Sequence, residues 1–390
     1  MKEYGLVLEG GGAKGAYHVG AIKALVENGY TFNAVVGTSI GALNAALVAQ
    51  GDFDKLAKIW HDVTYSTIFN VEEEKVEKTL NAKIDIDLIK YLSKKLGKTL
   101  KEGGIDTIKI RELLNENVDE EKLRKSDVKF GLVTYNLSDK QPEELFIEDI
   151  PEGKVIDYLM ASSSLPVFKT MKIDSKVYLD GGIYDNCPLH MLEKKGYKDV
   201  FIIRVFKKLK IRNYKNIIER GNVNIHMIAP NENLAGLLNF DNDTLKYMIK
   251  LGYYDALKSL KELDGFKYYI ESKEEEYFLN LLSKIEISEL EDIIRDLKLN
   301  FVINTNIKKM FIDIVMPLLV SKTQIKKANS NKESVYALLE YVALKENIER
   351  FKIYEFEGFL DIVKQKVNYE GKNKIDEAIY KIIKLLDINN

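Results

Sequence analysis

The chain has 390 residues, a net charge of −2, 30% charged and 46% hydrophobic residues, so it can bury a sizeable core and lacks the basic excess of nucleic-acid binders. Its single cysteine excludes internal disulfides, and no apolar run reaches the roughly 18 residues that span a bilayer. The N-terminus is predicted to be a core strand without a cleavable signal. These features favour a cytoplasmic enzyme whose contact with any membrane is peripheral.

A glycine-rich loop follows the first predicted strand, residues 4–8. Residues 9–15 (EGGGAKG) fit G-x-G-x-x-G, and the residues after them have helical spacing. A dinucleotide fold uses this loop for a pyrophosphate and needs an acid at the end of the next strand, but here the next strand, 33–37, leads to Ser39. We therefore expect a nest of N–H donors that faces Ser39, an oxyanion hole. Lys14 is either a positive charge near this site or a solvated lysine of the first helical turn.

Ser39 lies in the pentapeptide G-T-S-I-G of residues 37–41. A buried strand precedes it, and residues 42–50 predict a helix of small residues. A serine on such a tight turn projects its hydroxyl away from the sheet, and the flanking glycines allow the strained backbone. The alternative is an ordinary strand–turn–helix corner. The pattern indicates a nucleophile beside a helix N-terminus that can stabilise an oxyanion.

A second motif, Asp180-Gly181-Gly182, follows the predicted strand 176–179. An aspartate that leaves a strand into two glycines is often only a turn. Its surroundings favour a functional site over an ordinary turn: the block 161–168 (ASSSLPVF) precedes it, and the segment 184–189 (YDNCPL) follows it.

These motifs together resemble the patatin-like phospholipases, and they span roughly residues 4 to 190. The resemblance rests on four motifs in the family's order: the loop Gly10–Gly15, the turn Gly37–Gly41, the A-S-x-x-x-P-x-F block at 161–168, and Asp180-Gly181-Gly182 followed by Asn186 and Pro188. It implies Ser39 as nucleophile and Asp180 as its base. It further implies an oxyanion hole from Gly10, Gly11 and Gly12, a basic residue at Lys14, and supporting roles for Gly15, Gly37, Gly41, Gly181 and Gly182.

A histidine is the commonest base for a serine nucleophile, and the chain has four: His18, His61, His190 and His226. The order Ser-Asp-His would permit His190 or His226 as a third member. We favour a direct dyad of Ser39 and Asp180, which requires that burial raise the aspartate pKa from its usual value of roughly 4. We expect no metal or cofactor, because neither a Cys/His cluster nor a Ca²⁺ loop pattern is present.

The remaining pattern predicts the architecture. Continuous apolar strands suit a mostly parallel sheet covered on both faces; they are predicted at 4–8, 33–37, 129–136, 176–179, 199–205 and 223–228, with a hairpin between 130–135 and 144–147 and a helix over 230–260. We expect a three-layer α/β/α patatin-like hydrolase domain at 1–264 and an all-α domain at 265–390. That second domain could be a substrate cap, an oligomerisation element or a module for a protein partner.

Two segments have alternative interpretations. Residues 52–121 predict several helices, and one apolar face there either packs on the sheet or caps an acyl pocket; it consists of Ile86, Ile89, Leu92 and Leu96. A basic run is either a solvated loop or a contact with anionic lipid head groups; it consists of Lys207, Lys208, Lys210, Arg212, Lys215 and Arg220.

The expected function is hydrolysis of fatty-acyl esters of phospholipids or lysophospholipids through an acyl-enzyme on Ser39. A transacylase or thioesterase would use the same serine with a different acceptor. A malonyl-transferase type of site shares the serine turn but relies on a histidine. A regulatory lipid-binding protein would act through the helical tail with a vestigial site, and the intact Ser39, Asp180 and glycine loop argue against it.

Overall fold

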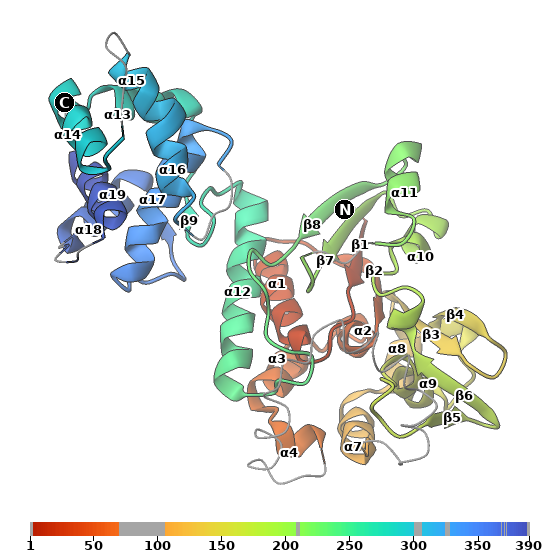
Figure 1. Cartoon of the computed structure of the whole chain (residues 1–390). Coiled ribbons are helices and arrows are strands. Elements are labelled where there is room, and N and C mark those ends of the chain that lie inside the picture. The colour runs from red at the N-terminus through yellow and green to blue at the C-terminus, as the bar shows by residue number, and fades with distance from the viewer. Residues whose placement is uncertain are drawn as a thin grey trace. The chain divides into compact units, whose positions relative to one another are not determined.

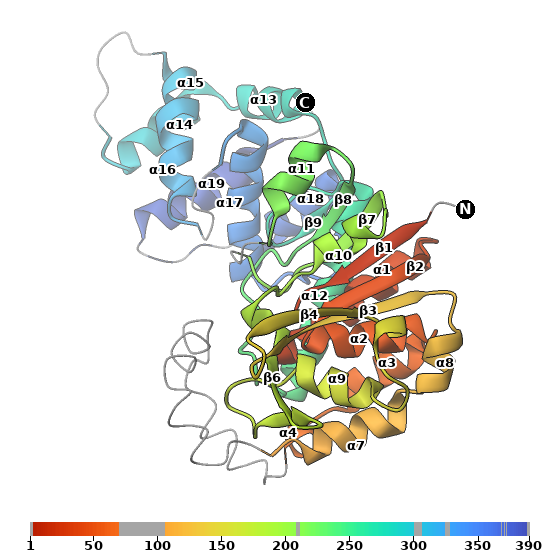
Figure 2. The ribbon, with the colours of Figure 1, turned by 90° about the vertical axis from the view of Figure 1, so that its right-hand side faces the viewer.

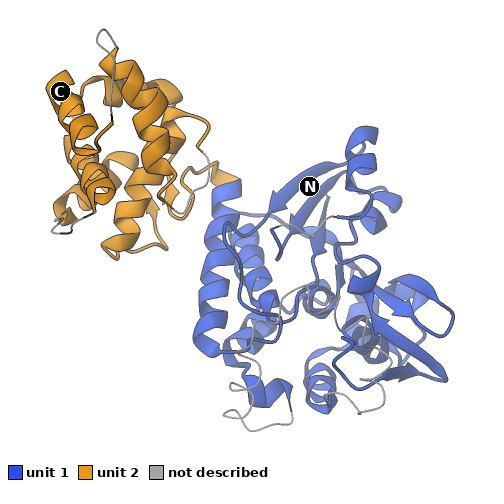
Figure 3. Cartoon of the chain, in the orientation of Figure 1, with its two compact units in different colours: residues 1–259 blue, residues 260–390 orange. Residues whose placement is uncertain are grey.

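The computed structural model describes residues 3–69, 106–207, 211–299, 306–323, 328–367, 369, 371 and 373–387. The chain divides into two compact units, residues 1–259 and 260–390 (Figure 3). The domain boundary expected after residue 264 stays a prediction. The apolar face at residues 86–96 and the lysines at 208 and 210 lie outside the described residues.

The first unit is built on a mixed eight-stranded sheet with the order β5-β6-β3-β2-β1-β7-β8, in which β4 also pairs with β3. The strands β3, β2, β1, β7 and β8 are parallel to one another, whereas β4, β5 and β6 join antiparallel. The bounds are β1 Tyr4–Leu8, β2 Phe32–Thr38, β3 Lys129–Asn136, β4 Gln141–Phe146, β5 Met171–Ile173, β6 Lys176–Asp180, β7 Asp199–Ile203 and β8 Asn224–Ile228. The sequence predicted every strand of this sheet except the short β5.

Helices cover both faces of this sheet, which explains why its central strands are apolar on both sides. Leu6, Val7 and Leu8 of β1 are fully buried. Figure 1 shows α1 and α12 on one side of the sheet and α10 and α11 on the other, and Figure 2 views the sheet from the side of α10 and α11. The helical segments are η1 Gly12–Gly15, α1 Ala16–Glu27, α2 Ile40–Ala49, α3 Phe53–Asp62, α4 Tyr65–Ile68, α7 Ile108–Asn117, α8 Glu120–Lys125, η2 Ile147–Asp149, α9 Val155–Ser162, η3 Gly181–Ile183, α10 Leu189–Lys194, α11 Tyr214–Arg220 and α12 Asn242–Lys261.

The expected three-layer α/β/α architecture is confirmed. On one face, Val36 and Val200 of the sheet share a buried cluster with Leu192 of α10 and Ile217 of α11. On the other face, α2 packs against β1, β2 and β3.

The helix predicted over residues 230–260 begins only at Asn242, so its first third was wrong. Residues 230–241 instead cross the glycine-rich loop, where the Leu237 carbonyl accepts a hydrogen bond of 2.7 Å from the Ala13 amide. This segment is held by an external partner rather than by its own helical hydrogen bonds.

The second unit is helical, as expected, and its described residues also include two paired strands of two residues each, β9 Tyr269–Ile270 and β10 Ile353–Tyr354. Its aromatic core joins Phe278, Tyr336 and Phe356, whose ring centroids lie 5.0–5.8 Å apart. The helices are α13 Glu275–Ser283, α14 Ile287–Asp296, α15 Ile307–Met310, the π-helical η4 Phe311–Val315, α16 Met316–Val320, α17 Asn331–Lys345, α18 Phe356–Lys366 and α19 Lys374–Leu385. Across the described ranges of both units, no helix combines the length and apolar character needed to cross a membrane.

Candidate active site

The strand register brings Ser39 and Asp180 together. Val133 of β3 pairs with Thr38, the last residue of β2, and the next residue, Thr134, pairs with Asp180, the last residue of β6. Because β4 occupies the other edge of β3 along both stretches, β2 and β6 share one edge of β3 and meet end to end. Ser39 follows directly after Thr38, so the hydroxyl and the carboxylate come from the two converging strand ends.

The turn at Ser39 has the strained geometry that the pentapeptide predicts. Ser39 has φ 55° and ψ −130°, a conformation that side-chain-bearing residues rarely adopt, and α2 begins at the next residue. A Cβ on Gly37 would run into the backbone of Gly41, and a Cβ on Gly41 would run into the Leu8 carbonyl. Both glycines are therefore needed for the strand, the turn and the helix to pack this closely.

Ser162 supports this turn, a role that the sequence analysis missed. The Ser39 amide donates to the Ser162 hydroxyl at 3.0 Å, and that hydroxyl donates to the Val133 carbonyl at 2.7 Å. Two residues further on, the Ser164 carbonyl accepts from the Asp180 amide at 2.9 Å. The block at 161–168 thus holds both Ser39 and Asp180, and the available signal was its place in the family's motif order.

Asp180 is buried, with 3% of its surface exposed. Burial raises its pKa to about 6, although the Ser39 side chain and the Gly182 amide, which donates to Oδ1 at 2.8 Å, act to lower it. Among the described residues, no hydrogen-bond partner is found for its Oδ2. A carboxylate with this pKa can accept a proton near neutral pH.

The glycine-rich loop is fixed against the turn that carries Asp180. The Gly10 amide donates to the Asn186 carbonyl, and the Asn186 side chain donates to the Gly10 carbonyl, both at 2.9 Å. A Cβ on Gly10 would run into the Asn186 side chain, so this glycine allows the two loops to approach. Within the second turn, a Cβ on Gly182 would also meet the Asn186 side chain, and one on Gly181 would meet the Val133 carbonyl of β3.

The expected oxyanion donors must be corrected at Gly10, because its amide is already used by Asn186. In the described part of the chain, the amides of Gly11 and Gly12 donate no hydrogen bond. Gly12 has φ 55° and lines the same pocket as Ser39. Gly11 and Gly12 are therefore the two loop donors available to a ligand beside Ser39.

Lys14 is not a solvated lysine, contrary to one of its two interpretations. Only 7% of it is exposed, and its Nζ lies 4.0 Å from the centre of the Phe206 ring. Gly15 lets this loop approach α2, because a Cβ there would contact the side chains of Ile40 and Trp60.

A buried ion pair anchors the start of the loop, and the sequence analysis missed it. Glu9 accepts from Arg204 at 3.0 Å and from the amides of Val205 and Phe206 at 2.7 and 3.1 Å. Burial raises the Glu9 pKa, while these donors oppose the shift. The pair joins the end of β1 to the chain that leaves β7.

The histidines have other partners. His190 lies 2.6 Å from Glu144 and 3.0 Å from Asp185; burial lowers its pKa, but these two carboxylates outweigh burial and raise it to about 9. His226 stacks on Phe201 within the sheet, and burial lowers the pKa of His18 to about 3. The contacts found in the described ranges include none between a histidine ring and Ser39 or Asp180.

An apolar pocket of about 840 Å³, part of it open to solvent, begins at Ser39 and Gly12. It is walled by one face of α2, by α3, α4 and α7, and by parts of the segments 163–168 and 238–240. Trp60 and Asn44 lie in this wall and are hydrogen-bonded to each other at 2.9 Å. Its apolar lining suits a hydrocarbon group whose reactive end lies at Ser39.

The described residues contain no group of three or more His, Cys, Asp or Glu side chains placed to hold a metal ion. The polar groups near Ser39 are the Asp180 carboxylate, which accepts hydrogen bonds, and backbone amides, which donate them.

The sequence of residues 6–193 matches the family described as Patatin-like phospholipase. Residues 6–193 form a domain of the patatin-like phospholipase family. The match covers the strands, loops and turn that form the site around Ser39.

Among curated relatives, Lysophospholipase nte1 of Aspergillus terreus is 41% identical over 83 residues, which are 17% of this chain and 5% of that protein. Lysophospholipase NTE1 of Yarrowia lipolytica is 25% identical over 219 residues, 52% of this chain and 12% of that protein. The patatin-like chain thus matches only a small part of these relatives' lengths. Among solved structures, the crystal structure of VipD from Legionella pneumophila aligns with 15% sequence identity and a TM-score of 0.43. The alignment covers 100% of this chain and 92% of the VipD chain.

Proposed function

We propose that this patatin-like protein is a serine acyl hydrolase that cleaves fatty-acyl esters of phospholipids or lysophospholipids through a dyad of Ser39 and Asp180. The observation that carries the proposal is the place of Ser39, between a buried carboxylate of raised pKa and the mouth of an apolar pocket. Membership of the family, and the names of the curated relatives, favour lipid esters among the possible acyl substrates.

In the first half of the reaction, Asp180 accepts the Ser39 proton as Oγ attacks the acyl carbonyl. The amides of Gly11 and Gly12 and the N-terminus of α2 stabilise the oxyanion. Protonated Asp180 then gives its proton to the departing alcohol, and the acyl group stays on Ser39 Oγ.

In the second half, Asp180 takes a proton from the water that attacks the acyl-enzyme, and it returns this proton to Ser39 Oγ as the fatty acid is released. The apolar pocket holds the hydrocarbon chain during both halves. A substrate drawn from a bilayer would require peripheral contact with the lipid surface. We assign no role to residues 260–390.

The test is hydrolysis of a panel of phospholipids, lysophospholipids and simple acyl esters by wild type, Ser39→Ala and Ser163→Ala. Ser163 is a matched control because it lines the same pocket, while its hydroxyl donates to the Leu159 carbonyl at 2.9 Å. We expect Ser39→Ala to lose all activity and Ser163→Ala to keep most of it. Equal activity in wild type and Ser39→Ala would overturn the proposal.

Product analysis with added alcohols and thiols separates hydrolysis from the alternatives. Free fatty acid as the main product supports a hydrolase. Acyl transfer to the added acceptor at the expense of free acid would favour a transacylase, and preference for thioester substrates would favour a thioesterase.

A further inference from the structure

The apolar pocket follows one face of α2. Ile40, Leu43, Asn44 and Leu47 line it, and their spacing of i, i+3, i+4 and i+7 places them in one stripe along the helix. At a helical rise of 1.5 Å per residue, the stripe from Ser39 to Leu47 is about 12 Å long. A hydrocarbon chain attached at Ser39 would therefore lie along α2 toward its C-terminal end.

The pocket is also lined by the end of α7. Asn117 is the last residue of α7, Val118 follows it, and both line the pocket together with Leu47 and Leu56. Asn117 lies beside the C-terminal end of α2, because its carbonyl accepts a hydrogen bond from Gln50, the residue that follows α2. The stripe on α2 therefore leads from Ser39 toward these two residues.

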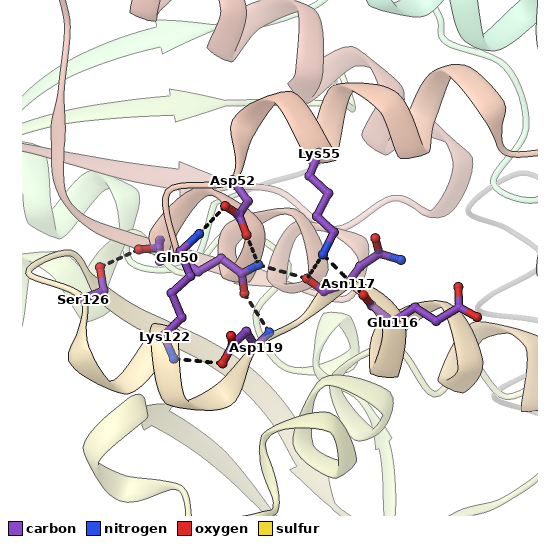
Figure 4. Close-up of polar contacts among 9 residues, drawn as sticks. Gln50, Asp52, Lys55, Glu116, Asn117, Asp119, Lys122 and Ser126 are labelled. Carbon is purple, nitrogen blue, oxygen red and sulfur yellow. Dashed lines mark hydrogen bonds and ion pairs between the residues drawn. The ribbon is translucent and has the colours of Figure 1, made fainter.

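The Gln50 side chain holds the end of α7 by hydrogen bonds to backbone atoms of Asn117 and Asp119 (Figure 4). Its side-chain amide donates to the Asn117 carbonyl at 2.9 Å and to Asp52 at 2.7 Å, and its carbonyl accepts from the Asp119 amide at 3.1 Å. The residue itself is 3% exposed. Breaking these bonds would leave buried polar groups without partners, so the arrangement resists opening.

Further bonds connect the ends of four helices, α2, α3, α7 and α8. Lys55 of α3 donates to the carbonyls of Glu116 and Asn117, each at 3.3 Å, and Lys122 of α8 forms an ion pair with Asp52. The hydrogen bond from Lys122 is the main cause that lowers the Asp52 pKa. We call Gln50, Asp52, Lys55 and their bonds to residues 116–122 the Gln50 latch.

We propose that the Gln50 latch closes the far end of the acyl pocket and so sets the longest acyl chain that the site accepts. The proposal rests on the proposed function in one respect: the carboxyl end of the chain must lie at Ser39. A carbon–carbon bond of about 1.5 Å advances a zigzag chain by about 1.3 Å per methylene, so 12 Å corresponds to roughly ten carbons. Longer chains must bend back or displace the latch.

Binding of saturated fatty acids of increasing length, below their micelle concentrations, tests this without any reaction. Trp60 is the only tryptophan of the chain and lines the pocket, so its fluorescence reports occupancy. Each added methylene should lower Kd about fourfold until the chain fills the pocket, after which Kd should stop falling. We call the chain length at which Kd stops falling the break. A Kd that keeps falling well beyond the expected length, without a break, or no binding at any length, would overturn the proposal.

Variants of the pocket wall should move the break. Leu47→Phe should shift it to shorter chains, and Leu43→Phe, one helical turn nearer Ser39, should shift it further by roughly five carbons. Leu279→Phe is the matched control, since Leu279 is 43% exposed on α13 of the other unit. An unmoved break in folded Leu47→Phe and Leu43→Phe would place the chain elsewhere.

The latch itself is tested by Gln50→Glu, which keeps the size of the side chain but replaces its donating amide nitrogen by a carboxylate oxygen that faces two acceptors, Asp52 and the Asn117 carbonyl. We expect the break to move to longer chains or vanish. Lys55→Ala removes a weaker, exposed part of the latch and should shift the break less. A folded Gln50→Glu variant with the wild-type break would contradict the role of the latch. If this variant does not fold, Lys55→Ala replaces it: a small shift of the break to longer chains supports the latch, and an unchanged break contradicts it.

Failure of this inference can be separated from failure of the proposed function. Absence of any Ser39-dependent hydrolysis, together with a length break that moves with Leu43, Leu47 and Gln50, would refute the proposed function alone. Ser39-dependent hydrolysis with no length break in either binding or kcat/KM would refute the inference alone.

Discussion

Gly10 and Asn186 are joined by two hydrogen bonds of 2.9 Å that run in opposite directions, although the residues are 176 positions apart in the chain. One bond uses the Gly10 amide, and the other uses the Gly10 carbonyl. The pair connects the glycine-rich loop to the turn that carries Asp180. Asn186 therefore helps to set the position of the proposed oxyanion donors relative to the proposed base.

Asn186→Ala should lower kcat by roughly tenfold to a hundredfold, because a small displacement of the base relative to the oxyanion donors is costly. The lost side-chain bond should reduce the free energy of unfolding by about 1 kcal/mol. Steady-state kinetics and thermal denaturation measure the two effects. Asn28→Ala is the matched control: its side chain donates to the Ala24 carbonyl at 2.8 Å at the end of α1, so its loss should affect stability but not kcat. Similar kcat losses in both variants would contradict the positioning role.

The activity should depend on pH through Asp180. The base must be deprotonated, and burial raises its pKa to about 6, so kcat/KM should fall about tenfold per pH unit below pH 6 and level off above it. His190→Gln should keep this profile, because His190 is paired with Glu144 and Asp185. A profile that loses its inflection near pH 6 in folded His190→Gln would favour a triad over the dyad.

Asp180→Asn should inactivate the protein and at the same time stabilise it. A carboxyl whose pKa is raised on folding binds its proton more tightly in the folded state, so the wild type loses stability as the pH rises from about 4 to 6 and stays less stable above that range. Removal of the charge should therefore increase the free energy of unfolding by roughly 2–3 kcal/mol at pH 8. The gain should vanish below pH 4, and denaturant titrations at both pH values would show it. Equal stability of wild type and Asp180→Asn at pH 8 would mean that burial does not penalise the charge.

Gly12→Ala should lower kcat by about 10²–10³ while KM changes little, because the Gly12 amide is one of the two proposed oxyanion donors. Its φ of 55° and the nearby Leu237 carbonyl leave no room for a Cβ without displacing the loop. Gly29→Ala controls for backbone strain: Gly29 has φ 84° but open space around it, so that variant should lose stability and keep its activity. Near-normal turnover in folded Gly12→Ala would place the oxyanion donors elsewhere, starting with the amide of Ile40.

The sequence was sufficient where local chemistry determines structure. The glycines at 37 and 41 and the small residues after them predicted the turn at Ser39, and continuous apolar runs predicted the parallel strands. The register that places Asp180 next to the end of β2 was not predictable, because it depends on β6 pairing with β3 across some 45 residues. The family resemblance supplied that pairing indirectly.

Other features were missed because they depend on long-range packing. The amide of Gly10 looks like any other loop donor until Asn186 is brought beside it. Lys14 has the local pattern of a surface lysine, yet Phe206 covers it. Residues 231–241 contain helix formers such as Leu237 and Leu238 but form no helix. The Leu237 carbonyl instead accepts a hydrogen bond from the glycine-rich loop, and Leu238 lines the pocket.

Covalent labelling with a serine-reactive alkyl phosphonate, followed by peptide mass spectrometry, tests directly whether Ser39 is the nucleophile. We expect one adduct, on Ser39, at a rate that falls sharply in Asp180→Asn, and no adduct in Ser39→Ala. An adduct retained by folded Ser39→Ala, or one found on Ser162, Ser163 or Ser164 in the wild type, would contradict the assignment of Ser39 as the nucleophile.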